Sequence, residues 1–180
     1  MHVLFLSGSP NRLSKTNAVL KTVQQSIEVP YSTSTIDILD VPADDLMQAR
    51  FQSPAIEKVK GEIENADIVV IGSPVYKASV PGVLKALLDL LPEGALIGKV
   101  VLPVATGGSI AHYLSLQYSL LPVLHILGAT SIIKPIFVLS EHVQLENGVA
   151  RIQDTQSLKR IDEAISKVKQ SLKQASYTNV

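Results

Sequence analysis

The feature that most constrains the fold is a regular alternation of short β-branched stretches with longer segments of helical periodicity. Because most of these stretches are apolar on both faces, they are typical of parallel strands that helices cover on both sides. Right-handed crossovers then predict a doubly wound, three-layer α/β sandwich with a five-stranded parallel sheet. The predicted strands cover residues 3–6, 33–39, 68–71, 100–105 and 131–139.

The segments between the predicted strands carry helix signals. In the first, Val19, Val23 and Ile27 recur every four residues on one face. The second starts at Ser53-Pro54, an N-cap residue followed by proline at the first helical position. Further apolar stripes predict helices over residues 83–91 and 155–174.

The C-terminal third of the chain departs from this regularity. Pro135 lies inside the last predicted strand, which favours an edge strand or a bulge there. Residues 141–156 are irregular and predict a small hairpin or loop, with a turn at 147–148. We expect one domain over residues 1–175 and a disordered tail over residues 176–180.

Composition narrows the class of protein. Sixteen basic and sixteen acidic residues cancel, so the chain has no basic footprint for nucleic acid or an anionic membrane surface. The absence of cysteine excludes disulfide scaffolds and thiol redox chemistry. No apolar run approaches the ~18 residues of a membrane span, and the first one is too short for a signal peptide. We therefore expect a soluble, cytoplasmic protein.

A hydroxyl-rich loop over residues 7–17 comes after the first strand and leads directly into a helix. Unpaired N–H groups, the helix dipole and the hydroxyls together make an anion site, to which Arg12 or Lys15 adds positive charge. The alternative is that Ser14 or Thr16 merely caps the helix.

The spacing in this loop decides between the known kinds of phosphate site. The P-loop pattern fails because five residues separate Gly8 from Ser14 and the second glycine is absent. The dinucleotide pattern G-x-G-x-x-G also fails for lack of further glycines. Elimination leaves the flavodoxin-like type, with strand order 2-1-3-4-5, in which an FMN phosphate rests on the first loop.

Two more strand ends are rich in glycine, proline and hydroxyl residues. After the third strand, Pro74 stiffens the backbone, Val75 and Tyr76 offer apolar and aromatic contact to a flat ring, and Lys77 offers positive charge. After the fourth strand, residues 106–109 read Thr-Gly-Gly-Ser, whose glycines let a ligand approach the backbone. Each loop alone is equally compatible with an ordinary turn. Together they predict one ligand site beyond the carboxyl ends of the strands.

Taken together, these motifs resemble the NAD(P)H-dependent FMN reductase family, which has a flavodoxin-like fold. The resemblance rests on Gly8-Ser9-Pro10 with Ser14 and Thr16-Asn17, on Ser73-Pro74-Val75-Tyr76-Lys77 and on Thr106-Gly107-Gly108. Residues 49–55, 84–93 and 98–103 resemble the branch that supplies reduced flavin to alkanesulfonate monooxygenases.

The resemblance implies a set of cofactors and ligand contacts. FMN would take a hydride at N5 from NADPH or NADH, and the sequence does not distinguish the two nucleotides. The FMN phosphate would be held by Ser9, Ser14, Thr16 and Asn17, and the ring by Pro74, Val75, Tyr76, Lys77, Thr106, Gly107, Gly108 and Ser109. The family often has arginine directly after Gly-Ser-Pro, whereas in this chain Asn11 takes that position and Arg12 comes next.

No side-chain set for acid–base or metal catalysis accompanies these loops. Donors at Gly107 and Gly108, and secondly Lys77, are expected to stabilise negative charge on the reduced ring. The alternative role for Lys77 is a contact with the phosphates of the nicotinamide cofactor. The leading hypothesis is an FMN reductase that releases reduced FMN to a partner monooxygenase, as in sulfonate-type sulfur assimilation. The alternatives are an FMN-bound reductase of quinones, azo dyes or metal oxyanions, and a flavodoxin-type electron carrier, against which the zero net charge argues.

The segment over residues 110–127 is apolar nearly all the way round. A helix of this kind is buried, and in a small domain burial on both sides requires another subunit. The segment thus predicts a homodimer or homotetramer. Pro122 should interrupt its hydrogen bonding. By resemblance to the sulfonate branch, Tyr118 is an insertion that makes a π-bulge at a tetramer interface near the flavin; the alternative is an ordinary interfacial tyrosine.

Overall fold

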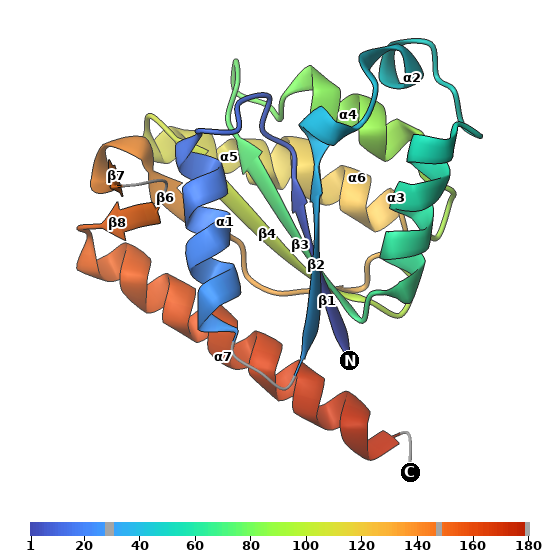
Figure 1. Cartoon of the computed structure of the whole chain (residues 1–180). Helices are drawn as coiled ribbons and strands as arrows, with labels where there is room; N and C mark the ends of the chain where they lie inside the picture. The colour runs from blue at the N-terminus through green and yellow to red at the C-terminus, as the bar shows by residue number, and fades with distance from the viewer. Residues whose placement is uncertain (28–30, 147–148, 179–180) are drawn as a thin grey trace.

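The computed structural model describes residues 1–27, 31–146 and 149–178. Its main sheet is parallel, with the order β2-β1-β3-β4-β5, and β6 also pairs with β4 (Figure 1). This order confirms the predicted flavodoxin-like fold. The strands are β1 (His2–Ser7), β2 (Ser32–Asp37), β3 (Ile68–Pro74), β4 (Val100–Gly107), β5 (Ser131–Ile132) and β6 (Ile136–Leu139).

Two helical layers cover the sheet because its strands are apolar on both faces. Along β1, Leu4 and Leu6 join one core cluster while Val3 and Phe5 join the other. Figure 1 shows the sheet between these two layers. The first layer contains α3 (Pro54–Asn65), α4 (Gly82–Asp89) and α6 (Leu121–Ile126), and the second contains α1 (Lys15–Ser26) and α7 (Thr155–Thr178).

The helix starts follow the capping signals in the sequence. Ser53 Oγ accepts a hydrogen bond from the Ile56 N–H at 3.3 Å, with Pro54 in the first turn of α3. The strand predicted over 33–39 ends earlier, at Asp37, because the Asp37 carboxylate accepts from the Leu39 N–H and starts a 3-10 turn, η1 (Ile38–Asp40). The short helix α2 (Ala43–Met47) had no periodicity from which to predict it.

The irregular C-terminal third contains the predicted hairpin and the predicted edge strand. The last strand consists of β5 and β6, which both pair with β4, and Pro135 lies in the break between them. A 3-10 turn, η4 (Ser140–His142), leads into the antiparallel pair β7 (Val143–Glu146) and β8 (Val149–Ile152). The turn predicted at 147–148 lies outside the described residues.

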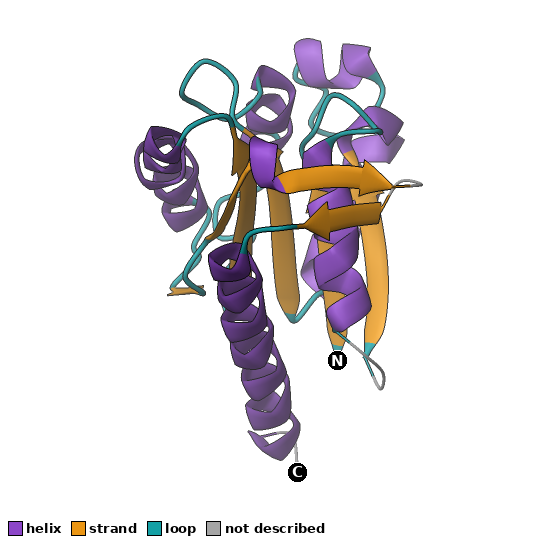
Figure 2. Ribbon diagram, turned by 90° about the vertical axis from the view of Figure 1, so that its left-hand side faces the viewer, coloured by secondary structure: helices purple, strands orange, loops and turns teal. Residues whose placement is uncertain are grey.

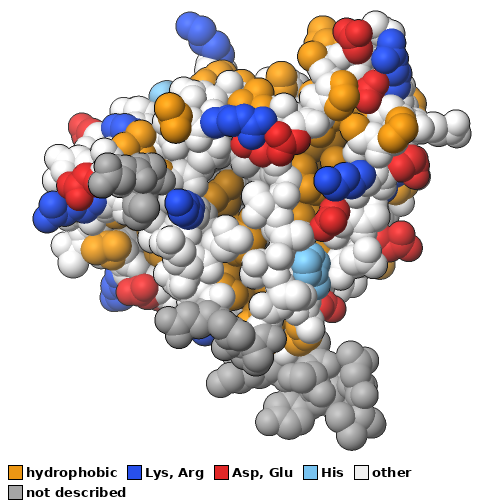
Figure 3. Space-filling view, viewed as in Figure 1, with side chains coloured by type: hydrophobic (Ala, Val, Ile, Leu, Met, Phe, Trp, Pro, Cys, Tyr) orange, Lys and Arg blue, Asp and Glu red, His pale blue; other side chains and the backbone are white. Residues whose placement is uncertain are grey.

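The last helix is longer than the sequence indicated. Helix α7 continues to Thr178, through part of the stretch predicted as a tail, and residues 179–180 lie outside the described ranges. No helix in the described ranges is long and apolar enough to cross a membrane. Basic and acidic side chains are interspersed over the face seen in Figure 3, as expected for a chain with zero net charge.

The helical segment after β4 is interrupted where the sequence indicates. It begins with η2 (Ile110–His112) and α5 (Tyr113–Ser115), passes through a π-helical turn, η3 (Leu116–Leu120), and continues as α6. The Leu121 N–H donates to the Leu116 carbonyl, five residues back. Pro122 has no N–H to offer the Tyr118 carbonyl, so an α-helical ladder cannot continue through this point. The π-helical turn at Tyr118 is therefore confirmed.

Gly72, at the carboxyl end of β3, is required by the packing of α1 on the sheet. A Cβ atom there would lie 2.2 Å from Cδ1 of the buried Leu20. We expect Gly72→Ala to lower the free energy of unfolding by about 1–3 kcal/mol through overpacking. Gly61→Ala is the matched control, because it meets open space in α3 and should stabilise by about 0.5–1 kcal/mol. Urea unfolding followed by circular dichroism measures both; an unchanged stability in Gly72→Ala would contradict the packing argument.

Candidate functional site

Three loops meet at the carboxyl edge of the sheet, as parallel strand order requires. The Gly8 N–H donates to the Gly72 carbonyl at 2.8 Å, which joins the first loop to the second. The Val75 N–H donates to the Thr106 carbonyl at 3.0 Å, which joins the second to the third. Thr16 Oγ1 and Thr106 Oγ1 lie 2.6 Å apart, both buried, and this hydrogen bond joins the third loop to the first. The predicted site residues therefore lie around one edge.

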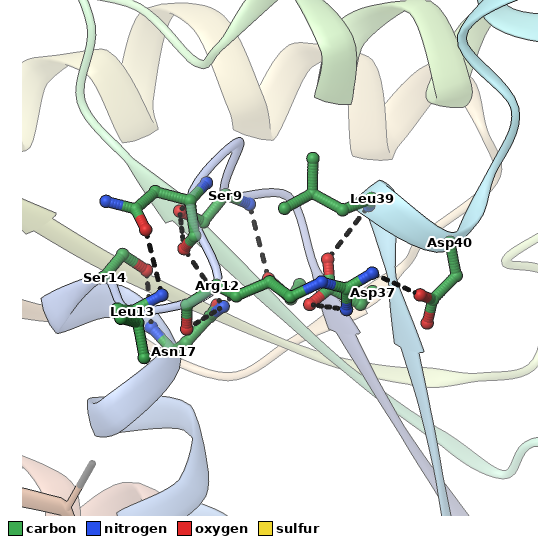
Figure 4. A network of polar contacts seen from close by, with 10 residues as sticks. Ser9, Arg12, Leu13, Ser14, Asn17, Asp37, Leu39 and Asp40 are labelled. Carbon is green, nitrogen blue, oxygen red and sulfur yellow. Dashed lines mark hydrogen bonds and ion pairs between the residues drawn. The ribbon is translucent and has the colours of Figure 1, made fainter. Parts of the chain in front are cut away.

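The first loop is folded by its own polar side chains (Figure 4). Asn17 Oδ1 accepts from Ser7 Oγ at 2.5 Å, and its Nδ2 donates to the carbonyls of Asn11 and Arg12 at 3.3 and 3.2 Å. Ser9 Oγ donates to the Asn11 carbonyl at 3.1 Å. Ser14 Oγ accepts from the Asn17 N–H at 3.1 Å and so caps α1, in agreement with the capping interpretation of this residue.

This folding leaves backbone donors available at the start of α1. Among the residues that the structure describes, the N–H groups of Arg12, Lys15 and Thr16 have no hydrogen-bond partner. Unpaired N–H groups at a helix N-terminus attract anions, because they donate directly and lie at the positive end of the helix dipole. No acidic residue occupies the first turn of α1. The loop therefore fits a phosphate group.

Both basic side chains of this loop are occupied by other partners. Arg12 pairs with Asp37 at 3.1 Å and with Asp40 at 2.5 Å, so its guanidinium lies toward the end of β2 (Figure 4). The hydrogen bond to the Asp40 carboxylate raises the pKa of Arg12 above its ordinary value. Lys15 Nζ donates to the Ser140 carbonyl at 2.5 Å. The donors left for a phosphate are backbone N–H groups and the Ser14 hydroxyl, because Ser9 Oγ donates to the Asn11 carbonyl and Thr16 Oγ1 is buried against Thr106 Oγ1.

The second loop contains a tight turn with unusual backbone angles. Two hydrogen bonds close this turn. The Tyr76 N–H donates to the Ser79 carbonyl at 2.9 Å, and the Ser79 N–H donates to the Tyr76 carbonyl at 3.0 Å. Lys77 and Ala78 between them have φ of 50° and 60°, which corresponds to a type I′ turn. Left-handed angles at non-glycine residues cost about 1–3 kcal/mol each and cluster at functional sites.

A side-chain hydrogen bond holds this turn against the π-helical turn. Ser79 Oγ donates to Ser119 Oγ at 3.1 Å, and Ser119 belongs to η3. The turn presents Tyr76, whose side chain is half exposed, and the exposed Lys77. The sequence motif located these two residues but gave no sign of the contact with Ser119.

The third loop combines a crowded glycine with an open one. A Cβ on Gly107 would lie 2.9 Å from His112 Cβ and 3.0 Å from the Phe137 ring, whereas Gly108 meets open space. Ser109 Oγ accepts from the Ala111 N–H and starts η2. Within the described ranges, the N–H groups of Gly108 and Ser109 donate to no protein acceptor. They can therefore donate to a ligand ring.

The donor set fits FMN better than a metal ion. The phosphate loop, the aromatic turn and the glycine loop together offer donors for an anion and for the polar edge of a flat ring. No cluster of His, Cys, Asp and Glu able to hold a metal occurs in the described part of the chain. Nδ1 of His112, behind the third loop, is buried and has no partner.

Sequence reasoning missed the contacts that hold the loops together. The Thr16–Thr106 and Ser79–Ser119 hydrogen bonds join residues 90 and 40 positions apart. The sequence showed that each loop contains hydroxyl residues. It did not show their partners, because the strand order brings Thr16 to Thr106 and the π-helical turn brings Ser119 to Ser79.

Comparison with known proteins agrees with this geometry. Residues 1–144 match the family model described as NADPH-dependent FMN reductase. The chain is 42% identical to an FMN reductase (NADPH) of Pseudomonas putida over 159 residues, covering 88% of this chain and 81% of that protein. It is 38% identical to an FMN reductase (NADPH) of Escherichia coli over 174 residues, covering 96% and 90%.

A solved structure of similar fold is the apo form of an NADH:FMN oxidoreductase (EMOB). It has a TM-score of 0.83 and 31% identity, and the match covers 94% of this chain and 89% of that one. The family match alone extends over all strands of the main sheet and all three loops. The chain therefore belongs to the NADPH-dependent FMN reductase family, and it is an oxidoreductase that acts on FMN with a nicotinamide nucleotide.

Proposed function

We propose that this reductase binds FMN as an exchanging substrate and releases the reduced flavin to a partner monooxygenase, of the kind used in sulfonate-type sulfur assimilation. The observation that carries the proposal is the engagement of Arg12 and Lys15 by protein partners. Charge-assisted hydrogen bonds are roughly twice as strong as neutral ones. A phosphate held by neutral donors alone dissociates more readily, which favours an exchanging flavin over a permanently bound one.

In this proposal each of the three loops binds and orients a different part of the flavin. The flavin supplies the redox chemistry by accepting a hydride at N5. The loop at Ser9, Ser14, Thr16 and Asn17 supports the phosphate, and the turn at Tyr76 covers the ring. The N–H groups of Gly108 and Ser109 stabilise negative charge at the ring edge, since preorganised donors act strongly in a site shielded from water.

Lys77 is proposed to contact the phosphates of the nicotinamide nucleotide. It is exposed and has no ion-pair partner among the described residues. The type I′ turn holds its backbone in place, and its exposed ammonium group is available to an anionic ligand.

The oligomer is proposed to form through the helical segment over residues 110–127. Its outer face exposes a stripe of large apolar side chains that lie four or eight residues apart. The exposed fractions are 63% for Ile110, 53% for Leu114, 79% for Tyr118 and 79% for Ile126. Contiguous exposed apolar side chains mark interaction sites, and each subunit of a symmetric oligomer presents the same stripe. We place this assembly in the cytoplasm, where NAD(P)H is available, with residues 1–175 as one domain.

The flavin requirement tests the proposed function directly. Purified protein should be colourless after gel filtration, and its oxidation of NADPH or NADH should rise with added FMN to saturation. Riboflavin, which lacks the phosphate, should require a higher concentration. A protein that stays yellow and turns over only with a quinone or azo dye would contradict release. Absence of turnover with any acceptor would favour an electron carrier.

Removal of the Lys77 charge should weaken nicotinamide binding. We expect Lys77→Ala to raise the KM for NADPH about 5- to 10-fold, as loss of one charge-assisted contact predicts, while the FMN dissociation constant stays unchanged. Lys85→Ala on the neighbouring helix α4 is the matched control, since Lys85 already pairs with Asp89 at 2.6 Å. Steady-state kinetics and flavin fluorescence quenching measure the two effects. Equal KM values in Lys77→Ala and wild type would remove this role.

A charge placed on the exposed stripe should prevent assembly. We expect Ile126→Glu to lower the molar mass measured by light scattering toward that of the 19.4 kDa chain, because burying an unpaired carboxylate in an apolar interface is unfavourable. Met47→Glu is the control, since Met47 is equally exposed at 79% but lies on α2. If both variants keep the wild-type mass, the interface lies elsewhere.

A further inference from the structure

A further cavity adjoins the phosphate loop. It has a volume of about 410 Å³ and lies between the first loop, α1 and β7. The hairpin of β7 and β8 packs beside α1 in Figures 1 and 2. Cavities of about 300–1,000 Å³ with apolar walls and a few polar groups are typical of small-molecule sites. The lining consists of Arg12, which pairs with Asp37 and Asp40, and of Leu13, Ser14, Asn17, Ala18, Lys21 and Leu145.

The lining combines exposed apolar side chains with positive charge. Leu13 of the first loop is 79% exposed and Leu145 of β7 is 42% exposed. No acidic residue lines the cavity, and in the described part of the chain Lys21 has no ion-pair partner. The nearby Glu146 pairs with Arg151 at 3.3 Å. The lining suits a ligand with one flat apolar part and one anionic part.

The position of Leu145 is fixed by the fold. Lys15 Nζ, at the start of α1, donates to the Ser140 carbonyl at the entry to the hairpin. Val143 and Ile152, on the two strands of the hairpin, belong to the same buried cluster as Val19 of α1. The cavity is therefore built from anchored elements.

We infer that this cavity is a subsite for the adenosine diphosphate half of a dinucleotide. The inference rests on the proposed function, because it takes the flavin phosphate to lie on the first loop. Ser14 and Asn17 belong both to that loop and to the cavity wall, so a group attached to the phosphate continues into the cavity. Lys21, one helical turn beyond Asn17, then meets the second phosphate, and Leu13 and Leu145 contact the adenine.

Two ligands carry this chemistry, FAD and the nicotinamide dinucleotide. A flavin phosphate on the first loop favours FAD, since its adenosine half is joined to that phosphate. The test therefore measures the dissociation constants of FAD, FMN and ADP by fluorescence quenching and by competition, and the KM for NADPH with FMN as acceptor.

The variants Leu145→Glu and Lys21→Glu place a negative charge where the adenine and the second phosphate would lie. We expect each to weaken FAD binding about 10-fold, which corresponds to ~1.4 kcal/mol, and to abolish competition by ADP, while FMN binding changes less than about twofold. Leu158→Glu is the control, because Leu158 is 40% exposed on α7, outside the cavity lining. Thermal unfolding of each variant confirms that the fold is intact.

The outcomes separate the possible sources and the possible failures. Weakened FAD binding with an unchanged KM for NADPH supports the flavin as the source. A raised KM for NADPH with unchanged FAD binding supports the same subsite with the nicotinamide nucleotide as its ligand. If neither quantity changes in either variant, the subsite is overturned. Absence of FMN binding by the wild-type protein would overturn the proposed function itself. The FMN dissociation constant of the wild type reports this outcome without reference to the variants.

Discussion

The hydrogen bond between Thr16 and Thr106 is the contact on which the site depends. Both residues are buried, and their Oγ1 atoms lie 2.6 Å apart, so each hydroxyl is the hydrogen-bond partner of the other. A buried hydroxyl without a partner costs about 1–3 kcal/mol, so neither residue can move without a penalty. The bond joins the start of α1, where the unpaired N–H groups lie, to the glycine loop after β4. This bond therefore fixes the spacing between the proposed phosphate donors and the proposed ring donors.

The charge distribution around the first loop is the physical basis of the proposed flavin exchange. Arg12 lies in the loop but is drawn to Asp37 and Asp40 at the end of β2, and Lys15 anchors the hairpin. The sequence contains the cations expected for tight phosphate binding, but in the folded protein both form contacts with other parts of the chain. The neutral donors that remain provide specificity for an anion with a smaller contribution to affinity.

The sequence was sufficient to predict the fold and to show which loops would meet at one edge of the sheet, because both depend on periodicity and on strand ends. Apolar runs on both faces of β1 and β3 indicated two helical layers, and Pro135 favoured an edge strand or a bulge. The sequence alone did not predict which residues individual side chains contact. Arg12 is two residues beyond Pro10 in the loop, and only the β1–β2 pairing shows that Asp37 lies beside it. Contacts such as Ser79–Ser119 depend on a change of helical register that no periodicity resolves.

The π-helical turn connects the outer surface to the flavin loop. One extra residue in a helical turn rotates the N-terminal part of the helix by about 100° relative to the C-terminal part, since an α-helix has 3.6 residues per turn. With that rotation, Ser119 meets Ser79 while the neighbouring Tyr118 is 79% exposed to solvent. In the proposed oligomer, a subunit that packs on Tyr118 would lie beside Ser119, whose hydroxyl contacts the turn that holds Lys77 and Ala78 at left-handed angles. One hydroxyl pair therefore links the proposed interface to the second loop of the candidate site, and π-helical turns of this kind are frequent at functional sites.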